Sequence, residues 1–365
     1  MDEKRIIEIQ SKVAGLLSES RLKQAIDTLE ELVDDLQEWG LRSQFNEMQT
    51  AYKYMLEYMR MGMPDPDREK LYANLTGRCY MLNDMVAAAR ISEHSTKVYC
   101  QMRRRYKNLD GLAALFDKLK ENRANKEITK ELPASECKSI SNELAREHET
   151  LLPQLFGMLW SSISWSKSDA EYIGRIMDDH EIPAKDRAVA VSAITLSALK
   201  CFEPLKAITL CTIAGNSDTM LSTRAIIGLI LVLYRYSERI MHYKELGDAI
   251  EAIKENAVVM RRIQTIQIQL LRCRETQKID RKMREEIIPA MMKNRNIHNE
   301  KFSIDILKEI ENDEDKNPEW SKWIEQDVKE KLDEMAKWQI EGADVYMSTF
   351  SQLKRFPFFS EICNW

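Results

Sequence analysis

The chain has five histidines, the side chain used most often for acid–base catalysis and metal binding near neutral pH. They are His94, His148, His180, His242 and His298. None has a second histidine or a cysteine at helical ligand spacing. Glu147 and Glu149 flank one of them, but consecutive helix residues point to different faces and cannot converge on one metal. The histidines therefore predict surface or capping roles and no metal site.

No sequence motif of a common catalytic site occurs. The chain lacks G-x-G-x-x-G, the phosphate-binding P-loop, H-E-x-x-H and G-x-S-x-G. Acidic pairs such as Asp178-Asp179 are typical of solvated helix faces. Cysteines are scattered singly without C-x-x-C, which favours buried thiols in a reducing compartment over a zinc site or disulfides. We predict no catalytic, cofactor-binding or metal-binding residue, and a chain that is not an enzyme.

Basic residues gather in the segment 261–284, where they outnumber acidic ones. Four of them fall on one side of a helix: Arg274, Lys278, Arg281 and Lys282. These residues are candidates for contact with a partner or with nucleic acid, because binding to phosphates depends on a positive surface. Residues 256–297 contain no aromatic side chain to stack on bases, so salt bridges to neighbouring helices or to a protein partner are also open. The "RRRYK" cluster at 103–107 is open to the same interpretations.

The composition predicts an all-α protein. Gly (11) and Pro (9) are scarce among 365 residues, and helix-forming residues recur throughout. The net charge of -5 is too small to direct the chain toward nucleic acid or an anionic membrane. The N-terminus has no signal-peptide pattern, and the apolar run from Ala225 to Leu233 is far shorter than the ~20 residues of a membrane helix. We therefore expect a cytoplasmic location and no membrane contact.

Two amphipathic patterns open the chain. Ile6, Ile9, Val13, Leu16 and Leu17 form one stripe, and a second runs from Leu22 to Leu36 in a helix expected to end near Gly40. The short "SESR" between them predicts an antiparallel hairpin. This stretch, "VAGLLSESRLKQAIDTLEEL", resembles a tetratricopeptide hairpin, with the small Ala25 at a close helix approach and Val13 where that motif has glycine.

An internal repeat follows later in the chain. Arg187 and Ala188 start an apolar helix followed by a break and a second helix, and Arg224 and Ala225 do the same 37 residues on. This period resembles helical-hairpin repeats of HEAT type. It implies that the apolar run 225–233 lies in the middle layer of a helical stack, buried on all sides.

Four segments are predicted in order along the chain. Residues 1–120 form tetratricopeptide-like hairpins, 121–135 a linker or exposed loop, 136–300 HEAT-like repeats, and 301–365 an acidic loop, a helix over 318–350 and an aromatic tail. The tail and "ETQKIDRKMREEIIPAMMK" resemble segments of long bacterial helical-repeat proteins described as tetratricopeptide-like. The aromatic end is expected either to dock onto the helices or to continue beyond Trp365 in the native protein.

Three local predictions concern individual side chains. Ser168 and Glu171 fit a capping box at a helix start. The stretch "YKYMLEYMRMGM" is expected to pack in the core, with an adaptable partner-binding surface as the alternative. Trp160 and Trp165 are expected to fill the core or the junction between the two halves.

Together these patterns predict an α-solenoid of antiparallel helical hairpins. Each hairpin buries one face against its neighbours, so the array keeps an extended surface exposed. Such a surface suits a protein or peptide partner, and we predict a non-catalytic scaffold or adaptor for protein–protein interaction. The alternative is a nucleic-acid-binding array that uses the basic helix 261–284. A catalytic array would need His, Asp or Glu from several helices gathered in one pocket.

Overall fold

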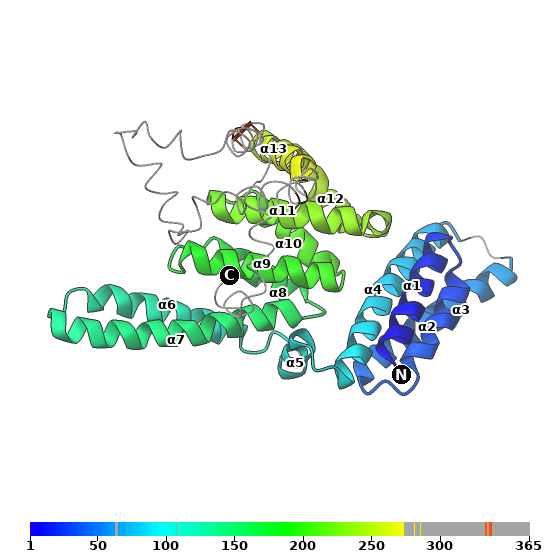
Figure 1. The fold of residues 1–365 in the computed structure, drawn as a ribbon. Coiled ribbons are helices and arrows are strands. Elements are labelled where there is room, and N and C mark those ends of the chain that lie inside the picture. The colour runs from blue at the N-terminus through cyan, green and yellow to red at the C-terminus, as the bar shows by residue number, and fades with distance from the viewer. Residues whose placement is uncertain are drawn as a thin grey trace. The chain divides into compact units, whose positions relative to one another are not determined.

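Helices follow one another along the whole described part of the chain (Figure 1). The computed structural model describes residues 1–62, 65–106 and 108–273, and the single positions 281, 285, 333, 336 and 337. No strand occurs within these residues, which confirms the all-α prediction. The chain divides into two compact units, Met1–Ile263 and Gln264–Trp365, and the contacts below lie in the first.

The first four helices share one core. They are α1 (Glu3–Ser18), α2 (Leu22–Val33), α3 (Trp39–Arg60) and α4 (Arg68–His94). The predicted stripe of α1 is buried except for Leu16, which is partly buried, and α1 packs on α2 across a turn in which Ser20 has a φ of 61°. All three earlier helices contact α4. The prediction that α2 extends to Gly40 is wrong: the helix ends at Val33 because Asp35 turns left-handed, with a φ of 61°, and Gly40 lies in α3.

A pair of long helices replaces the predicted linker at 121–135. After α5 (Val98–Arg105), α6 (Leu112–Thr129) and α7 (Ala134–Ser161) pack against each other. Asn122 is buried and its Nδ2 donates to the Leu144 carbonyl (2.9 Å) and to Glu147 Oε2 (2.7 Å). Most of the other polar residues that suggested a loop are Glu, Lys and Arg, which are good helix formers, on the exposed side, and only residues 130–133 lie between the two helices.

Short and long helices alternate in the remainder of the described chain. The short ones have 11 residues each: α8 (Lys167–Met177), α10 (Pro204–Ala214) and α12 (Lys244–Lys254). The long ones have 17 residues each: α9 (Ala184–Lys200), α11 (Thr219–Arg235) and α13 (Ala257–Cys273). A 3₁₀ segment, η1 (Ser237–His242), precedes α12.

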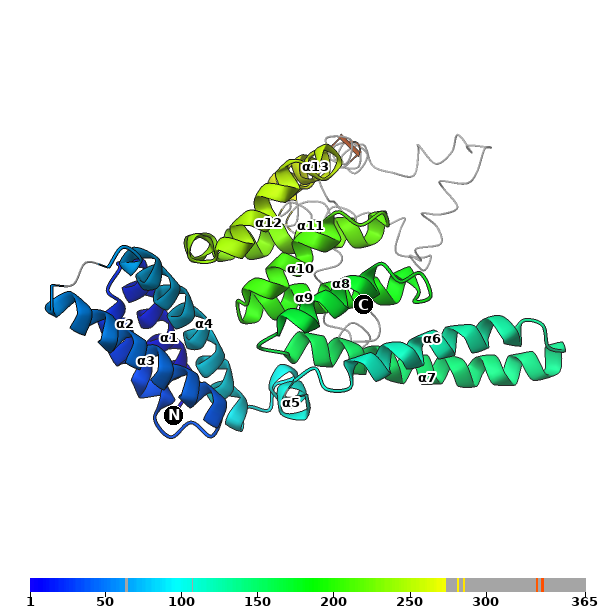
Figure 2. The same cartoon turned by 180° about the vertical axis from the view of Figure 1, so that it is seen from behind.

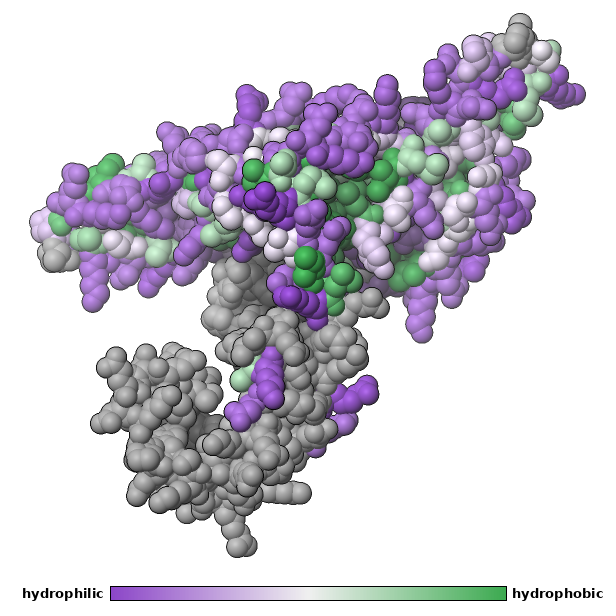
Figure 3. All heavy atoms as spheres, turned by 90° about the horizontal axis from the view of Figure 1, so that it is seen from above, coloured by the Kyte–Doolittle hydropathy of each residue, from purple (hydrophilic) through white to green (hydrophobic). Residues whose placement is uncertain are grey.

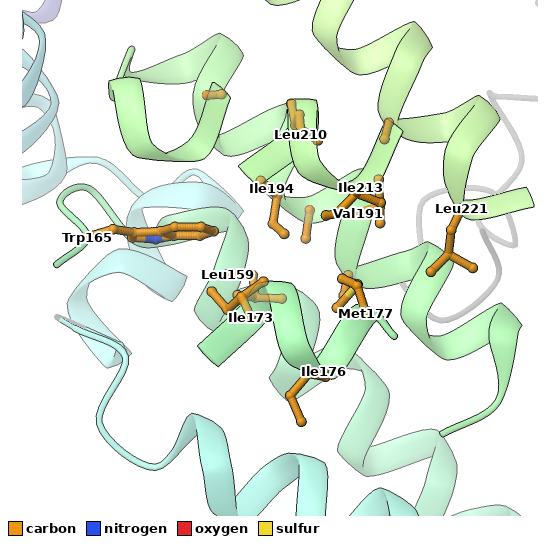
Figure 4. Packing of buried hydrophobic residues seen from close by; sticks show 14 of the residues in the cluster. Leu159, Trp165, Ile173, Ile176, Met177, Val191, Ile194, Leu210, Ile213 and Leu221 are labelled. Carbon is orange, nitrogen blue, oxygen red and sulfur yellow. The ribbon is translucent and has the colours of Figure 1, made fainter. Parts of the chain in front are cut away.

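These helices pack in two adjoining rows. The long α9 contacts α11 and the 28-residue α7, the short α10 contacts α8 and α12, and α10 also contacts α9 and α11 (Figure 1, Figure 2). Side chains from α7 to α11 meet between these rows, among them Leu159, Ile173, Val191 and Leu210 (Figure 4). Trp165 is buried in this core, which agrees with the prediction of a core role. Trp160 is partly buried and packs against the same core.

The helix starts follow local chemistry. Ser166, not Ser168, is the N-cap of α8: its Oγ accepts from the Asp169 backbone N–H (3.1 Å), and the Asp169 carboxylate accepts from the Ser166 N–H (2.8 Å). The capping box therefore lies two residues before the predicted one, because Ser166 has the extended backbone that a cap needs. Asp218 caps α11 in a similar way.

The apolar segment 225–233 lies in α11 and is buried on one side only. Ala225, Ile226, Leu229 and Val232 are buried, whereas Ile227 and Leu231 are 37% and 38% exposed. The prediction that this helix is buried all round is therefore wrong for its outer side. Within the part of the chain that the structure describes, no helix is both long and apolar enough to cross a membrane.

Candidate interaction surface

A group of charged and aromatic side chains is buried around Asp84 in α4. Its Oδ1 accepts from Gln10 Nε2 of α1 (3.0 Å), and its Oδ2 accepts from Arg239 of η1. The backbone N–H of Phe202 also faces Oδ2, at 3.4 Å. These groups come from four separate segments, so one carboxylate holds α1, α4, η1 and the turn before α10 together.

Aromatic rings enclose the arginine of this ion pair. The Arg239 guanidinium lies 4.7 Å from the ring centroids of both Tyr80 and Tyr236. Tyr243 donates its hydroxyl to the Gly77 carbonyl (2.7 Å), and burial raises the pKa of Tyr236 to about 12. Every hydrogen-bonding group named here already has a partner inside the protein. The arrangement is therefore that of a structural clamp, and it presents no free acid, base or nucleophile to a substrate.

A second buried group has the residue types of a serine–lysine catalytic pair. Lys206 of α10 is fully buried, and its Nζ lies 2.9 Å from the Oγ of Ser197. The same Nζ donates to the carbonyls of Ser162 (2.6 Å) and Ile163 (3.1 Å). Burial lowers the pKa of Lys206 to about 8.

The direction of these hydrogen bonds argues against catalysis. A general base needs a free lone pair directed at the nucleophile, but three acceptors surround this ammonium group. The Ser197 hydroxyl donates its own proton to the Ser162 carbonyl (2.9 Å). Lys206 therefore serves to hold the turn between α7 and α8 against α9 and α10.

We expect the contribution of Lys206 to stability to depend on pH. Its pKa is lowered in the folded state, to about 8 from 10.5, so between these values the unfolded chain holds a proton that the folded chain lacks. The free energy of unfolding of the wild type, minus that of Lys206→Met, should be constant below pH 8 and rise by ~3 kcal/mol toward pH 10.5. Urea unfolding at several pH values measures this difference.

The matched control is Lys118→Met, at an exposed lysine of α6, which removes the same charge from the surface instead of from the core. A flat profile for Lys206→Met would contradict the burial of an ammonium group in this core.

Several of the remaining candidates from the sequence have structural partners. His148 Nε2 lies 2.9 Å from the carboxylate of Asp186, which is buried. In the basic cluster at 103–107, Arg103 pairs with Glu38 (2.6 Å), and Arg104 donates to the Ser95 carbonyl (2.9 Å) at the end of α4. No three His, Cys, Asp or Glu side chains among the described residues lie close enough to share a metal ion.

The proposed contact residues of the basic helix are almost entirely beyond what the structure describes. Arg274, Lys278 and Lys282 lie outside the described residues, and Arg281 is a single described position, helical and exposed. Nearer the start of α13, Arg262 donates to the Ser222 Oγ (2.6 Å). No contact of the described residues favours nucleic-acid binding.

Exposed apolar side chains form the clearest feature of the surface. Hydrophobic patches interrupt a mostly hydrophilic exterior in Figure 3. On α11, Met220, Ile227, Leu231 and Tyr234 are 42%, 37%, 38% and 85% exposed. With Arg224 they follow one another at steps of three and four residues, which places them on one face of the helix.

Helix α9 extends this face. Gly228 of α11 lies so close to Thr195 of α9 that an added Cβ would stand 2.8 Å from its Cγ2 and 3.0 Å from its Cβ. On the outer side, Arg224 donates to the Ser192 Oγ (2.8 Å). One turn further along α9 is Leu196, which is 44% exposed. We name Leu196, Ile227, Leu231 and Tyr234 the α9–α11 face.

A second exposed stripe lies on α3 and the residue after it, in the Met- and Tyr-rich stretch expected to pack in the core. Met55 is buried, but Tyr54, Tyr58, Met59 and Met61 are 59%, 54%, 51% and 72% exposed. The prediction of core packing is therefore wrong for these four residues. They lie on the outer side because the inner side of α3, which contacts α4, is already filled by Phe45 and Met48.

Comparison of the chain with protein-family models, with curated proteins and with solved structures gave no match. The resemblance to tetratricopeptide and HEAT repeats therefore stays a prediction, and the α9–α11 face must be interpreted from its own residues.

Sequence reasoning missed most of these features. The Asp84–Arg239 pair joins residues far apart in the chain, and no local pattern indicates it. The burial of Lys206 could have been predicted, because it is the one charged residue in the apolar helix "PLKAITLCTIA". The α9–α11 face also left one: Arg224 and Tyr234 stand on the same face as Ile227 and Leu231, which is typical of a helix side that meets water.

Proposed function

We propose that this chain is a non-catalytic scaffold or adaptor for protein–protein interaction, built as an α-solenoid. The alternation of 11- and 17-residue helices supports repeated short–long hairpins, in which helices of equal length stack. Arg224 and Arg262 stand at the same position counted from the first residues of α11 and α13, and each donates to a serine of the preceding long helix. The tetratricopeptide-like character of α1–α4 belongs to the same proposal.

The α9–α11 face is the observation that carries this function. A soluble monomer rarely exposes several large apolar side chains side by side, and such patches mark sites where another protein binds. The helices beneath are fixed by close packing at Gly228 and by the Arg224–Ser192 hydrogen bond. The surface is therefore preorganised, which lowers the entropic cost of binding.

We test this function by capture from the source cell with the full chain as bait. Wild type is compared with Tyr234→Asp, which adds a charge to the α9–α11 face at its most exposed side chain. Ile128→Asp, at a 62% exposed residue of α6, is the matched control. We expect a partner that wild type and the control retain and that the Tyr234 variant loses by about tenfold or more, the effect of removing one well-placed contact.

The partner is then purified and its affinity for the three chains is measured. Equal retention by all three, or no protein retained above the empty support, would contradict the proposed function.

A further inference from the structure

We propose that the α9–α11 face binds an amphipathic helix whose apolar stripe has carboxylates along its edge. This inference rests on the proposed function and names the class of its partner. It follows from the spacing of the exposed apolar residues, from the hydrogen bonds that already occupy the backbone of the two helices, and from the charges around the face.

The spacing on α11 matches a helical partner. Met220, Ile227, Leu231 and Tyr234, with Arg224 between the first two, repeat at the three- and four-residue steps by which one helix packs along another. The 17 residues of α11 give it a length of about 25 Å, enough for about four turns of a partner helix. Leu196 of α9 borders the stripe and widens the apolar surface.

An extended peptide would bind this face poorly. A strand gains its affinity from hydrogen bonds to an open sheet edge. Backbone groups within α9 and α11 are hydrogen-bonded inside their own helices, so the face offers only side chains. A helical peptide also makes its backbone hydrogen bonds internally. It therefore leaves fewer backbone groups without a hydrogen-bond partner than an extended peptide does when it binds here.

The charges around the face select an acidic partner. Lys200, Arg224 and Arg235 are exposed at its edge, and the described residues give none of them an ion pair; Lys200 and Arg235 lie 5.5 Å from the ring centroids of Tyr99 and Tyr236. The only acidic residue in α9 and α11 is Asp186, which is buried against His148. Carboxylates beside the apolar stripe of a partner would meet these cations, which favours association and sets orientation.

A second copy of this chain and a nucleic acid fit the face less well. Two copies that met through α11 would bring like charges together at Arg224 and Arg235, which disfavours self-association. The phosphates of a nucleic acid would find no cation at Ile227 and Leu231. Tyr234 is the one exposed ring on α11 on which a base could stack.

The experiment is a selection from a displayed library of helical peptides of the length of α11, with all outward positions randomised. The full chain is the bait, and Tyr234→Glu is used for counter-selection, because a side chain that is 85% exposed can be replaced without disturbing the core. One enriched peptide is synthesised with a fluorescent label, together with a version in which its Asp and Glu are replaced by Asn and Gln. Fluorescence anisotropy then gives their affinities for wild type, Tyr234→Glu, Arg235→Glu and the control Tyr58→Glu on α3.

We expect enriched peptides with apolar residues at three- and four-residue steps and with Asp or Glu beside them. The selected peptide should bind wild type and Tyr58→Glu alike, and about tenfold or more weaker to Tyr234→Glu and to Arg235→Glu. Neutralising its carboxylates should weaken binding to wild type and change binding to Arg235→Glu much less.

Enriched peptides without this pattern, unchanged affinity for Tyr234→Glu, or no enrichment would each overturn the proposal. A dimer of the wild type that Tyr234→Glu dissociates would also overturn it, in favour of a second copy. If a cellular partner is still captured through Tyr234 while the peptides fail, the interaction function stands and only the helical acidic partner is wrong.

Discussion

Asp84→Asn should lower the free energy of unfolding by ~3–5 kcal/mol, the loss typical of removing one charge from a buried ion pair. The substitution keeps the shape of the side chain and leaves the Arg239 guanidinium buried without its counter-charge. Asp84 also accepts a hydrogen bond from Gln10 and faces the Phe202 N–H. The loss of stability should therefore affect all four segments that Asp84 joins. Urea unfolding followed by circular dichroism measures the change.

Two further variants show whether burial is the cause. Asp27→Asn removes a carboxylate from an exposed pair with Lys23, in which both side chains are more than half exposed, and it should change stability by less than about 1 kcal/mol. Replacing both Asp84 and Arg239 by apolar residues should be less harmful than Asp84→Asn alone, because no unpaired charge then remains. A loss for Asp84→Asn as small as that for Asp27→Asn would contradict the clamp.

Gly228→Ala should destabilise the protein by ~1–3 kcal/mol, although alanine favours a helix over glycine by up to ~1 kcal/mol. The new methyl group would overlap the Thr195 side chain, which is itself held by a hydrogen bond from its Oγ1 to the Val191 carbonyl (3.0 Å). Helices α9 and α11 must then separate. Thermal and urea unfolding measure the stability, and peptide affinity reports on the α9–α11 face.

The control for Gly228→Ala is Gly174→Ala in α8. An added Cβ there meets nothing within 4 Å, so this variant should be unchanged or more stable by up to ~1 kcal/mol. Thr195→Ala in the Gly228→Ala background removes Oγ1 and Cγ2, the two Thr195 atoms nearest to the added methyl group, and should restore part of the lost stability. Equal behaviour of Gly174→Ala and Gly228→Ala would show that close helix approach at residue 228 is not required.

The sequence pattern predicts the fold where each helix has one apolar side. The stripe Ile6–Leu17 and the hairpin with α2 follow from three- and four-residue spacing and a short turn. Prediction failed at 121–135, because α6 packs mainly along one helix, α7, and therefore has few apolar residues there, so its polar side resembles a loop. It failed near Gly40, because the helix end is set by the left-handed backbone of Asp35 rather than by the glycine.

The surface and the buried polar groups were harder to predict for a different reason. Burial of Asp84 and Arg239 depends on contacts between distant segments, which periodicity within one helix cannot show. The apolar run in α11 indicated burial on all sides, whereas Ile227 and Leu231 face outward. Hydrophobicity alone does not distinguish a helix side that packs in the core from one that binds a partner, since water is excluded from both once the partner is bound.

The most direct measurement is photo-crosslinking in the source cell, with p-benzoylphenylalanine in place of Leu231 on the α9–α11 face. The same residue in place of Ile128 on α6 serves as the control. We expect one discrete adduct from position 231 that is absent from position 128, and that disappears when Tyr234→Asp is added. No adduct at position 231, or the same adducts at both positions, would contradict the assignment of this face as the interaction surface.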